Sequence, residues 1–210
     1  MLLHPPLSFP PVVAPTLGAA WLGLLRAVLA SGERVEDYVE VLGLAYSVPE
    51  LPPADPILDR FADQATVAEM RKVYHSAEPN RFGHSYRERM VGPVPGAPAD
   101  ALVAVLGRDR HSRRAVLTLV PAGDGGVPCV NVVQFLVRDD VLVVQGFARG
   151  QDVLDKFPAD AICLCDIAGE VRSRLGLRAL ALSGTIGSAH VYSAQVPRAQ
   201  ALLDAAAGAG

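Results

Sequence analysis

Cysteine and arginine, two residue types that carry out chemistry in enzymes, stand at the ends of expected strands. Cys129 comes directly before the apolar run 130–137, and Arg149 follows the run 141–148. A positive charge near a thiol favours the thiolate, which is the nucleophilic form of cysteine. A guanidinium also binds a phosphate dianion through two parallel hydrogen bonds. This pair of residues therefore predicts nucleophilic chemistry on a phosphorylated substrate.

Two further residue pairs occupy comparable positions. Arg113 and Arg114 precede an expected strand, and His190 and Tyr192 stand two residues apart within the strand-forming segment 177–196. Each residue also has an ordinary explanation, because charged side chains at strand ends are usually solvated and a histidine in an apolar strand is usually part of the core. Their order and spacing along the chain give them more weight than their types do.

The elements that position these residues are helices and strands in mixed order. One helix begins after Thr16 as its N-cap and ends at Gly32, because apolar residues recur at helical spacing between them. Turn residues at 138–140 predict a hairpin of two strands. Further strands are expected at 38–48, 114–120 and 177–196, and further helices at 56–75, 99–106, 159–175 and the alanine-rich C-terminal end. Strands with segregated helices indicate an α+β fold.

Composition excludes several classes of protein. The 210 residues include 19 basic and 22 acidic side chains, a net charge of −3, so no nucleic acid or anionic membrane partner is expected. Half of the residues are hydrophobic, which is enough for a folded core. The apolar stretch 17–30 is interrupted by Gly23 and Arg26 and is shorter than the ~20 residues of a membrane-spanning helix.

The chain is expected to form one domain in the cytoplasm. Residues 1–15 hold five prolines and should form an arm on the surface or on a partner, and 16–210 should form a single catalytic domain. The prolines and the missing basic residues argue against a secretory signal at the start. Three cysteines predict reduced thiols, and Cys163 with Cys165 makes a poor metal site because residues i and i+2 of a helix point to different faces. No metal is expected.

The spacing of the chemical residues resembles that of the thymidylate synthase and nucleotide hydroxymethylase family. The motifs that carry the resemblance are Pro128-Cys129-x4-Gln134-Phe135, Arg149-x2-Asp152-Val153-x4-Pro158, His190-x-Tyr192, Ser112-Arg113-Arg114 and Gly83-x-x-Tyr86. The resemblance implies a bent mixed β-sheet with helices packed on one face and a homodimer that pairs sheet to sheet. It also implies that Arg113 and Arg114 act across the interface, on the phosphate held by the other subunit.

The resemblance further implies a reaction. The sulfur of Cys129 would add to C6 of a pyrimidine nucleoside monophosphate, and C5 would then attack the methylene of 5,10-methylenetetrahydrofolate. The exocyclic methylene left after folate departs would be trapped by water, giving hydroxymethyl, or by hydride, giving methyl. Tyr86 would help to remove the C5 proton. Glu69 is a candidate for the catalytic carboxylate, with an exposed helix face as its ordinary explanation.

The same resemblance assigns binding roles. Gln134 would position the cysteine strand and the nucleotide. His190 and Tyr192 would bind the sugar 3′-hydroxyl, Arg149 would bind the phosphate, and Asp152 would lie near the pterin of the folate.

Two departures from the family point to the substrate. Asp160 replaces an asparagine that matches uracil, and a protonated carboxyl would match cytosine instead, since it can accept from the amino group and donate to N3. The alternative is that Asp160 caps the helix 159–175. Gly150 replaces a serine that contacts phosphate and opens space for a 2′-hydroxyl, so CMP is favoured over dCMP.

Other departures keep two alternatives open. Val130 replaces the histidine after the nucleophile, Asp155 and Lys156 replace a leucine-glycine pair, and the arginine loop near the family's N-terminus is not recognisable. A chain that stops soon after its last helix would lack the tail that excludes water, which favours hydroxymethylation. The alternatives are a synthase that methylates dUMP or a related nucleotide, and a non-catalytic nucleotide-binding homologue.

Overall fold

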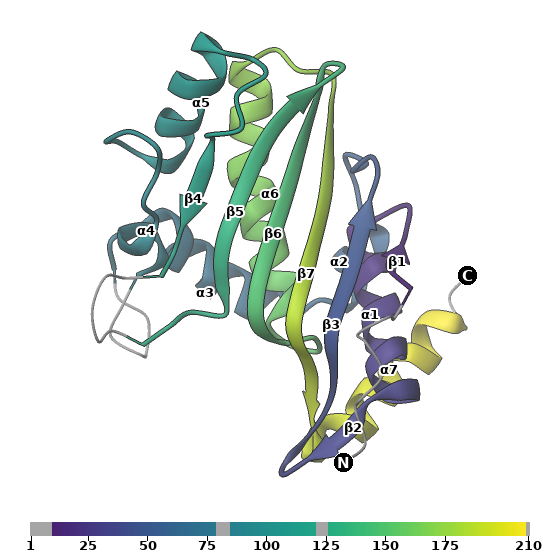
Figure 1. Cartoon of the computed structure of the whole chain (residues 1–210). Helices are drawn as coiled ribbons and strands as arrows, with labels where there is room; N and C mark the ends of the chain where they lie inside the picture. Colours follow the sequence, from purple (N-terminus) through teal and green to yellow (C-terminus); the bar gives the residue numbers. More distant parts are fainter. Residues whose placement is uncertain (1–9, 79–84, 121–125, 209–210) are drawn as a thin grey trace, which may run out of the picture.

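The computed structural model describes residues 10–78, 85–120 and 126–208, which form one mixed β-sheet with helices (Figure 1). The strands are β1 Val12–Val13, β2 Glu33–Val35, β3 Tyr38–Val48, β4 Val116–Thr118, β5 Val130–Arg138, β6 Val141–Asp152 and β7 Ala179–Tyr192. The helices are α1 Leu17–Ser31, α2 Pro56–Phe61, α3 Gln64–His75, α4 Tyr86–Arg89, α5 Pro98–Arg108, α6 Phe157–Arg174 and α7 Val196–Ala207, with a 3₁₀ turn at Ser193–Gln195.

The sheet has the strand order β1-β3-β7-β6-β5-β4 over the described residues, and β2 pairs with the edge of β3. β5 and β6 form the expected antiparallel hairpin, whose turn residues Asp139 and Asp140 both have positive φ. β6 and β7 are parallel, and α6 crosses between them along the sheet. This crossover brings the end of β6 and the first turn of α6 to the same end of the sheet.

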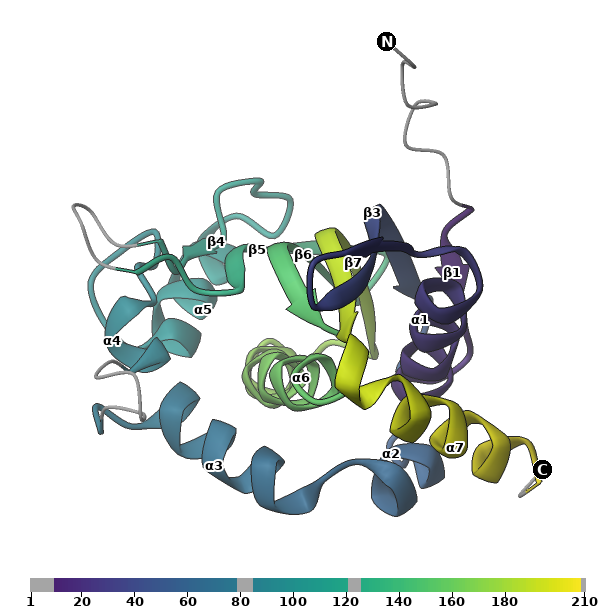
Figure 2. The same cartoon turned by 90° about the horizontal axis from the view of Figure 1, so that it is seen from below.

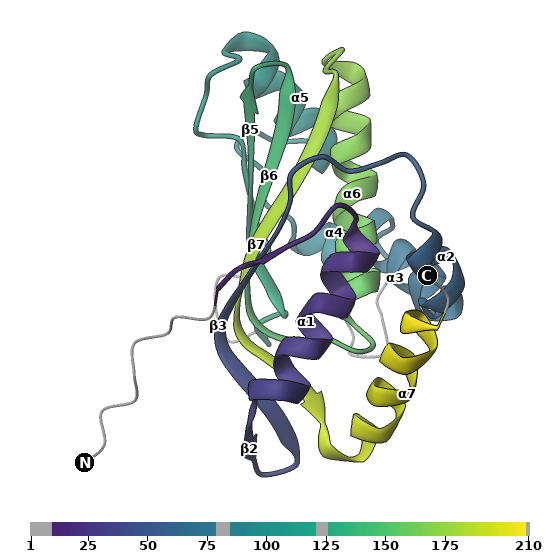
Figure 3. The ribbon, with the colours of Figure 1, turned by 90° about the vertical axis from the view of Figure 1, so that its right-hand side faces the viewer.

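The sheet bends at one level across three adjacent strands (Figure 3). Gly43 and Gly187 have no partner in the register of β3 with β7. Arg149 has none in the register of β6 with β7. Gly43 has a φ of 67°, and a Cβ on Gly187 would lie 2.6 Å from the carbonyl oxygen of Arg149. Two glycines are therefore required for this close approach, and Arg149 stands at the bend.

The helices cover one face of the sheet (Figures 2 and 3). α6 lies under the centre of the sheet, and α3 lies beyond it, so the molecule has three layers at this point (Figure 2). The core between them includes the fully buried Trp21, Tyr74 and Phe135. Leu42, Val132 and Phe147 are exposed on strands of the same sheet. The expected α+β fold with a bent mixed sheet is confirmed.

Several element boundaries follow the sequence prediction closely. α1 has Thr16 as N-cap and ends before Gly32, and β3 covers the expected residues 38–48. The predicted helix 56–75 is wrong as one element, because it divides into α2 and α3. Ala62 leaves the helical conformation with ψ 142°, and Asp63 caps the new helix through a bond from the Ala65 amide.

The predicted N-terminal arm contributes one short strand. Val12 and Val13 form β1, which pairs in parallel with β3, and Ala14 is buried. Residues 1–9 of that segment lie outside the described residues. The strands β1 and β2 and the helix α4 were not expected from the sequence, since two to four residues carry too little periodicity to reveal them. None of the helices in the described part of the chain has the length and hydropathy of a membrane span.

Candidate nucleotide site at the bend of the sheet

Cys129 is held at the start of β5 by the side chain of Asn131. The Asn131 amide donates to the carbonyl of Pro128 at 2.9 Å, and its oxygen accepts from the backbone amide of Arg149 at 2.9 Å. The Arg149 amide also lies 3.0 Å from the carbonyl oxygen of Cys129, to which it donates. These bonds fix the half-buried thiol beside the bend of β6.

The Arg149 guanidinium lies over the segment that precedes the cysteine. Its Nε and Nη2 donate to the carbonyl oxygen of Val127, at 3.2 and 2.8 Å. The side chain is otherwise exposed, so its remaining donors face solvent. A phosphate close to Cys129 could therefore be bound by this guanidinium.

Asp160 lies in the first turn of α6, it is 4% exposed, and its charge acts on the Cys129 thiol. Its Oδ1 accepts from the hydroxyl of Tyr74 at 3.1 Å, and its Oδ2 accepts from Nε2 of Gln151 at 2.7 Å. The expectation that Asp160 caps α6 is wrong, because the N-cap is Lys156 and Asp160 donates its own amide to the Lys156 carbonyl. Its side chain is instead part of a buried polar network.

Tyr86 completes this network from α4. Its ring packs edge-on against Tyr74 at a centroid distance of 4.9 Å, and the backbone of Cys129 hydrogen-bonds its hydroxyl. Ser85 fixes the start of α4, since its hydroxyl donates to the Ser76 carbonyl at 2.6 Å. Burial and the charge of Asp160 raise the pKa of Tyr86, so it is a neutral hydroxyl at physiological pH.

The electrostatic setting of Cys129 differs from the sequence expectation. Burial is the largest cause and Asp160 the next, and together they raise the pKa of the thiol, while Arg149 and Lys156 oppose the shift. The prediction that the cationic cluster favours the thiolate therefore does not hold for one protomer alone. Arg113 and Arg114, the other members of the predicted cationic cluster, are exposed elsewhere on the same chain.

Asp160 has the most altered carboxyl group of the site. Burial raises its pKa to about 6, against the opposing effects of the bonds from Gln151 and Tyr74 and the charge of Lys156. A carboxyl with this pKa exchanges a proton near neutral pH, which suits it to donate or accept a hydrogen bond. Beside it, between the sheet and α6, lies a cavity of about 20 Å³, the size of one water molecule.

His190 and Tyr192 lie where β7 meets the ends of β3 and β6. His190 pairs with Asp152 on one side and Glu40 on the other, and its ring lies 5.4 Å from that of Tyr38 and 5.5 Å from that of Tyr192. The two residues therefore share one side of the sheet, next to the segment 149–152.

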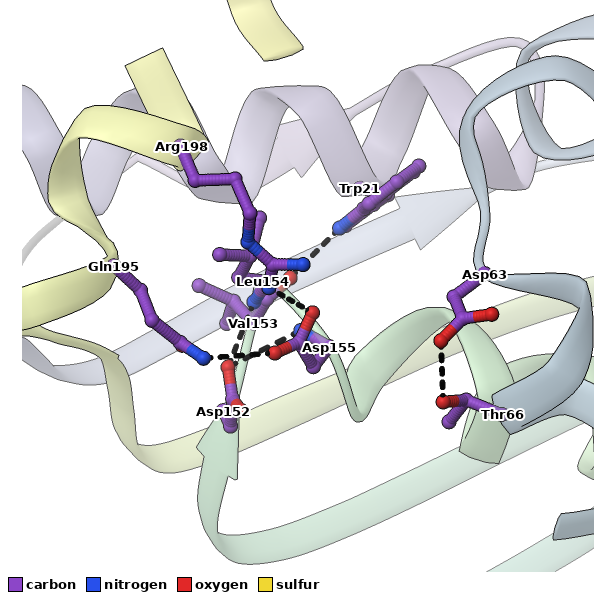
Figure 4. A network of polar contacts seen from close by, with 9 residues as sticks. All are labelled: Trp21, Asp63, Thr66, Asp152, Val153, Leu154, Asp155, Gln195 and Arg198. Atoms are coloured by element: carbon purple, nitrogen blue, oxygen red, sulfur yellow. Dashed lines mark hydrogen bonds and ion pairs between the residues drawn. The ribbon is translucent and has the colours of Figure 1, made fainter. Parts of the chain in front are cut away.

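The loop after Asp152 is bonded to α1 and to the C-terminal elements (Figure 4). Oδ1 of Asp152 accepts from the amides of Leu154 and Asp155 at 3.0 and 3.2 Å, and burial raises the pKa of its carboxyl. Trp21 of α1 donates to the Val153 carbonyl at 2.7 Å. Asp155 accepts from Gln195 and forms an ion pair with Arg198. The C-terminal elements thus fix the loop that presents Asp152.

Arg113 and Arg114 lie far from Cys129 of the same chain. Gln134 donates to the Arg113 carbonyl at 2.9 Å, so it positions this loop. The Ala115 carbonyl accepts from Phe135, which is six residues along β5 from Cys129. At ~3.3 Å per residue the separation is about 20 Å.

The remaining predicted residues are placed as follows. Gly150 is buried in β6 opposite Ser188 of β7. Glu69 is exposed on α3, whereas the face of α3 toward the core carries Met70, Val73 and Tyr74. The structure does not bring Glu69 to the thiol. Gly83 lies outside the described residues.

Sequence reasoning missed Asn131, Tyr74 and Gln151. Gln151 stands between two predicted site residues, which is the only signal that could have indicated it; Tyr74 has none, because its partner is 86 residues away. A cleft of about 530 Å³ lies elsewhere, between α6 and the β3–α2 loop, and it includes none of the predicted site residues. Across the described ranges, histidine, cysteine and acidic side chains form no group of three that could hold a metal ion.

The bent mixed sheet and the site at its bend define an α+β protein in which a thiol, a guanidinium and a buried carboxyl lie near one another. The chain is 26% identical over 197 residues to a protein of Methanocaldococcus jannaschii named "Putative thymidylate synthase", a match that covers 85% of this chain and 88% of the relative. No protein-family model matches the chain. The similarity supports a thymidylate synthase-like family, and the observed architecture is consistent with a thymidylate synthase-like fold.

Proposed function

We propose that the protein is a C5-hydroxymethylase of pyrimidine nucleoside monophosphates, with CMP favoured over dCMP and 5,10-methylenetetrahydrofolate as the one-carbon donor. The observation that carries the proposal is that Arg149 of β6, Tyr86 of α4 and Asp160 of α6 converge on Cys129, the residue before β5, at the bend of the sheet. One-carbon transfer at family level is also supported by the likeness to the archaeal relative.

The chemistry assigned to these residues runs as follows. The sulfur of Cys129 bonds to C6 of the pyrimidine, and the electron pair at C5 attacks the methylene carbon of the folate. Loss of the C5 proton, aided by Tyr86, expels tetrahydrofolate and leaves an exocyclic methylene. Water adds to that methylene, and the sulfur leaves C6, which restores the thiol. The reaction consumes the nucleotide, methylenetetrahydrofolate and water, and it yields the hydroxymethyl nucleotide and tetrahydrofolate.

Asp160 supports cytosine as the base. With a pKa of about 6, its carboxyl can be protonated when a cytosine binds, and it can then donate to N3 while it accepts from the amino group. Tyr74 and Gln151 hold the carboxyl in one orientation. An asparagine in this network would match uracil instead.

The phosphate and the sugar are assigned to residues on the open side of the sheet. Arg149 is the phosphate ligand from the same chain, joined by Arg113 and Arg114 of the partner subunit in a sheet-to-sheet homodimer. The separation of about 20 Å within one chain supports this assignment across the interface. The added charge would also lower the pKa of Cys129 toward the reactive range. His190 and Tyr192 hold the 3′-hydroxyl, and Asp152 holds the pterin.

Product analysis tests the proposal. The protein is incubated with CMP, dCMP and dUMP in the presence of methylenetetrahydrofolate, and products are identified by mass. A hydroxymethyl product from CMP or dCMP is expected, and Cys129→Ala should abolish it while Cys165→Ala, a change of a thiol on α6, should not. Product from dUMP alone would overturn the choice of base.

The relative's name favours one second candidate, a synthase that methylates dUMP. Hydride transfer would oxidise the folate to dihydrofolate, which is followed by absorbance, whereas hydroxymethylation leaves tetrahydrofolate. The raised pKa of the Cys129 thiol favours the other alternative, a homologue that binds nucleotides without catalysis. Release of tritium from C5 of the nucleotide, lost in Cys129→Ala, would exclude it.

A further inference from the structure

Glu40 lies beside the predicted sugar-binding residues, on a strand that carries none of the recognised motifs. In the register of β3 on β7, Glu40 pairs with His190 and Tyr38 pairs with Tyr192. Paired residues of neighbouring strands point to the same side of a sheet, with Cβ atoms about 5 Å apart. The Glu40 carboxylate is therefore on the side of the sheet that His190 and Tyr192 present.

Ser188 orients this carboxylate. Its hydroxyl donates to Oε2 of Glu40 at 2.5 Å, and both side chains are half-buried. Within the described part of the chain, no donor approaches Oε1, so that oxygen can accept a hydrogen bond from a ligand. A carboxylate accepts strongly from a hydroxyl, and it offers nothing to a carbon-bound hydrogen.

Gly150 of β6 leaves space beside Ser188 that a side chain would occupy. Gly150 pairs with Ser188, and a Cβ added to it would lie 3.8 Å from the Ser188 carbonyl oxygen and 4.0 Å from the Ser188 Cβ. Any side chain at this position would stand over Ser188. Gly150 follows the proposed phosphate ligand Arg149 in the chain and pairs with Ser188, so the Ser188–Glu40 pair lies near the proposed phosphate position.

We propose that Glu40, oriented by Ser188, accepts a hydrogen bond from the ribose 2′-hydroxyl and makes the site selective for ribonucleotides. The inference rests on the proposed function, because His190 and Tyr192 must hold the 3′-hydroxyl for the neighbouring 2′-hydroxyl to reach Glu40. A site built to bind a hydroxyl discriminates against the analogue that lacks it, because the half-buried Glu40 carboxylate then loses that hydrogen bond. Glu40 determines specificity, and Ser188 is a positioning residue.

The test compares CMP, dCMP and the arabino epimer of CMP, in which the 2′-hydroxyl points to the other side of the ring. Dissociation constants are measured by calorimetry and kcat/KM by product formation. Glu40→Ala should lower the preference for CMP over dCMP about tenfold, equivalent to ~1.4 kcal/mol, by weakening CMP and leaving dCMP nearly unchanged. The wild type should bind the arabino epimer like dCMP.

Three further variants separate the orientation of the Glu40 carboxylate by Ser188 from a general effect of negative charge nearby. Ser188→Ala should lower the same preference by a smaller factor, about threefold, and Ser188→Thr should restore it. Glu33→Gln removes a carboxylate on β2 opposite Glu40 and should leave the preference unchanged. An unchanged CMP to dCMP ratio in Glu40→Ala, with both nucleotides still bound, would overturn this inference alone. Failure of every pyrimidine nucleotide to bind would overturn it together with the proposed function.

Discussion

Gln151 of β6 donates to Asp160 of α6 at 2.7 Å, and this bond joins the sheet to its central helix at the candidate site. Both side chains are almost fully buried, and Tyr74 of α3 supplies the second donor to the same carboxylate. Buried polar groups of this kind are stable only when each is bonded. The network therefore links the sheet, α6 and α3 to one another at the candidate site.

The first prediction concerns the pH dependence of nucleotide binding. If cytosine requires a protonated Asp160, binding takes up a proton at every pH above the pKa of about 6. The dissociation constant of CMP should then be flat below pH 6 and rise about tenfold per unit above it. Calorimetry in buffers of different ionisation enthalpy measures the proton uptake. Equal pH profiles for CMP and a uracil nucleotide would contradict the assignment.

The second prediction concerns stability. A pKa raised from 3.8 to about 6 means that Asp160 favours folding when protonated, and this contribution is lost as pH rises through 6. Asp160→Asn should therefore gain stability relative to the wild type between pH 4 and pH 7, by about 3 kcal/mol at most. Thermal unfolding at several pH values measures the difference. A difference that does not change with pH would show that the carboxyl titrates normally.

The third prediction concerns Asn131. Asn131→Ala removes the bond to the Pro128 carbonyl and one of the two bonds from the Arg149 amide, which keeps its bond to the Cys129 carbonyl. We expect a loss of about 2 kcal/mol in the free energy of unfolding and a fall in kcat of about tenfold through misplacement of Cys129. Asn131→Asp keeps the acceptor for Arg149 and should keep part of the activity. Wild-type turnover in both variants would contradict the positioning role.

The fourth prediction concerns Trp21. Trp21→Phe keeps most of the buried ring and removes the bond to the Val153 carbonyl, so unfolding should become easier by about 2 kcal/mol. The loop that carries Asp152 should also loosen, which would raise KM for the folate more than KM for the nucleotide. Tyr46→Phe is the matched control, because its hydroxyl has no partner among the described residues. Equal KM changes for both substrates would argue against a loop effect.

The fifth prediction concerns the dimer. Cys129→Ala and the double variant Arg113→Ala, Arg114→Ala should each be inactive in catalysis. Mixed in equal amounts and allowed to exchange subunits, they should regain about a quarter of the wild-type activity, since half of the dimers then contain one intact site. Activity that stays absent after exchange, in a mixture shown to contain heterodimers, would place the arginines outside the other subunit's site.

Local patterns in the sequence were enough for most of the fold. The caps Thr16 and Gly32 and the residues 38–48 gave elements at the observed positions, because capping and strand-forming residues act over a few neighbours. The bend of the sheet was implied only by resemblance. It depends on Gly43 and Gly187 meeting across two strands, which are 144 residues apart in the chain.

The sequence by itself determined the types and spacing of the chemical residues, including Cys129, Arg149 and Asp160. The tertiary structure decided their environments. Whether Asp160 caps a helix or accepts from Tyr74, and whether the Cys129 thiol is acidic, depends on burial and on partners that other elements supply. A pKa is set by the charges and the solvent around a group in space, and the order of residues along a chain does not contain that information directly.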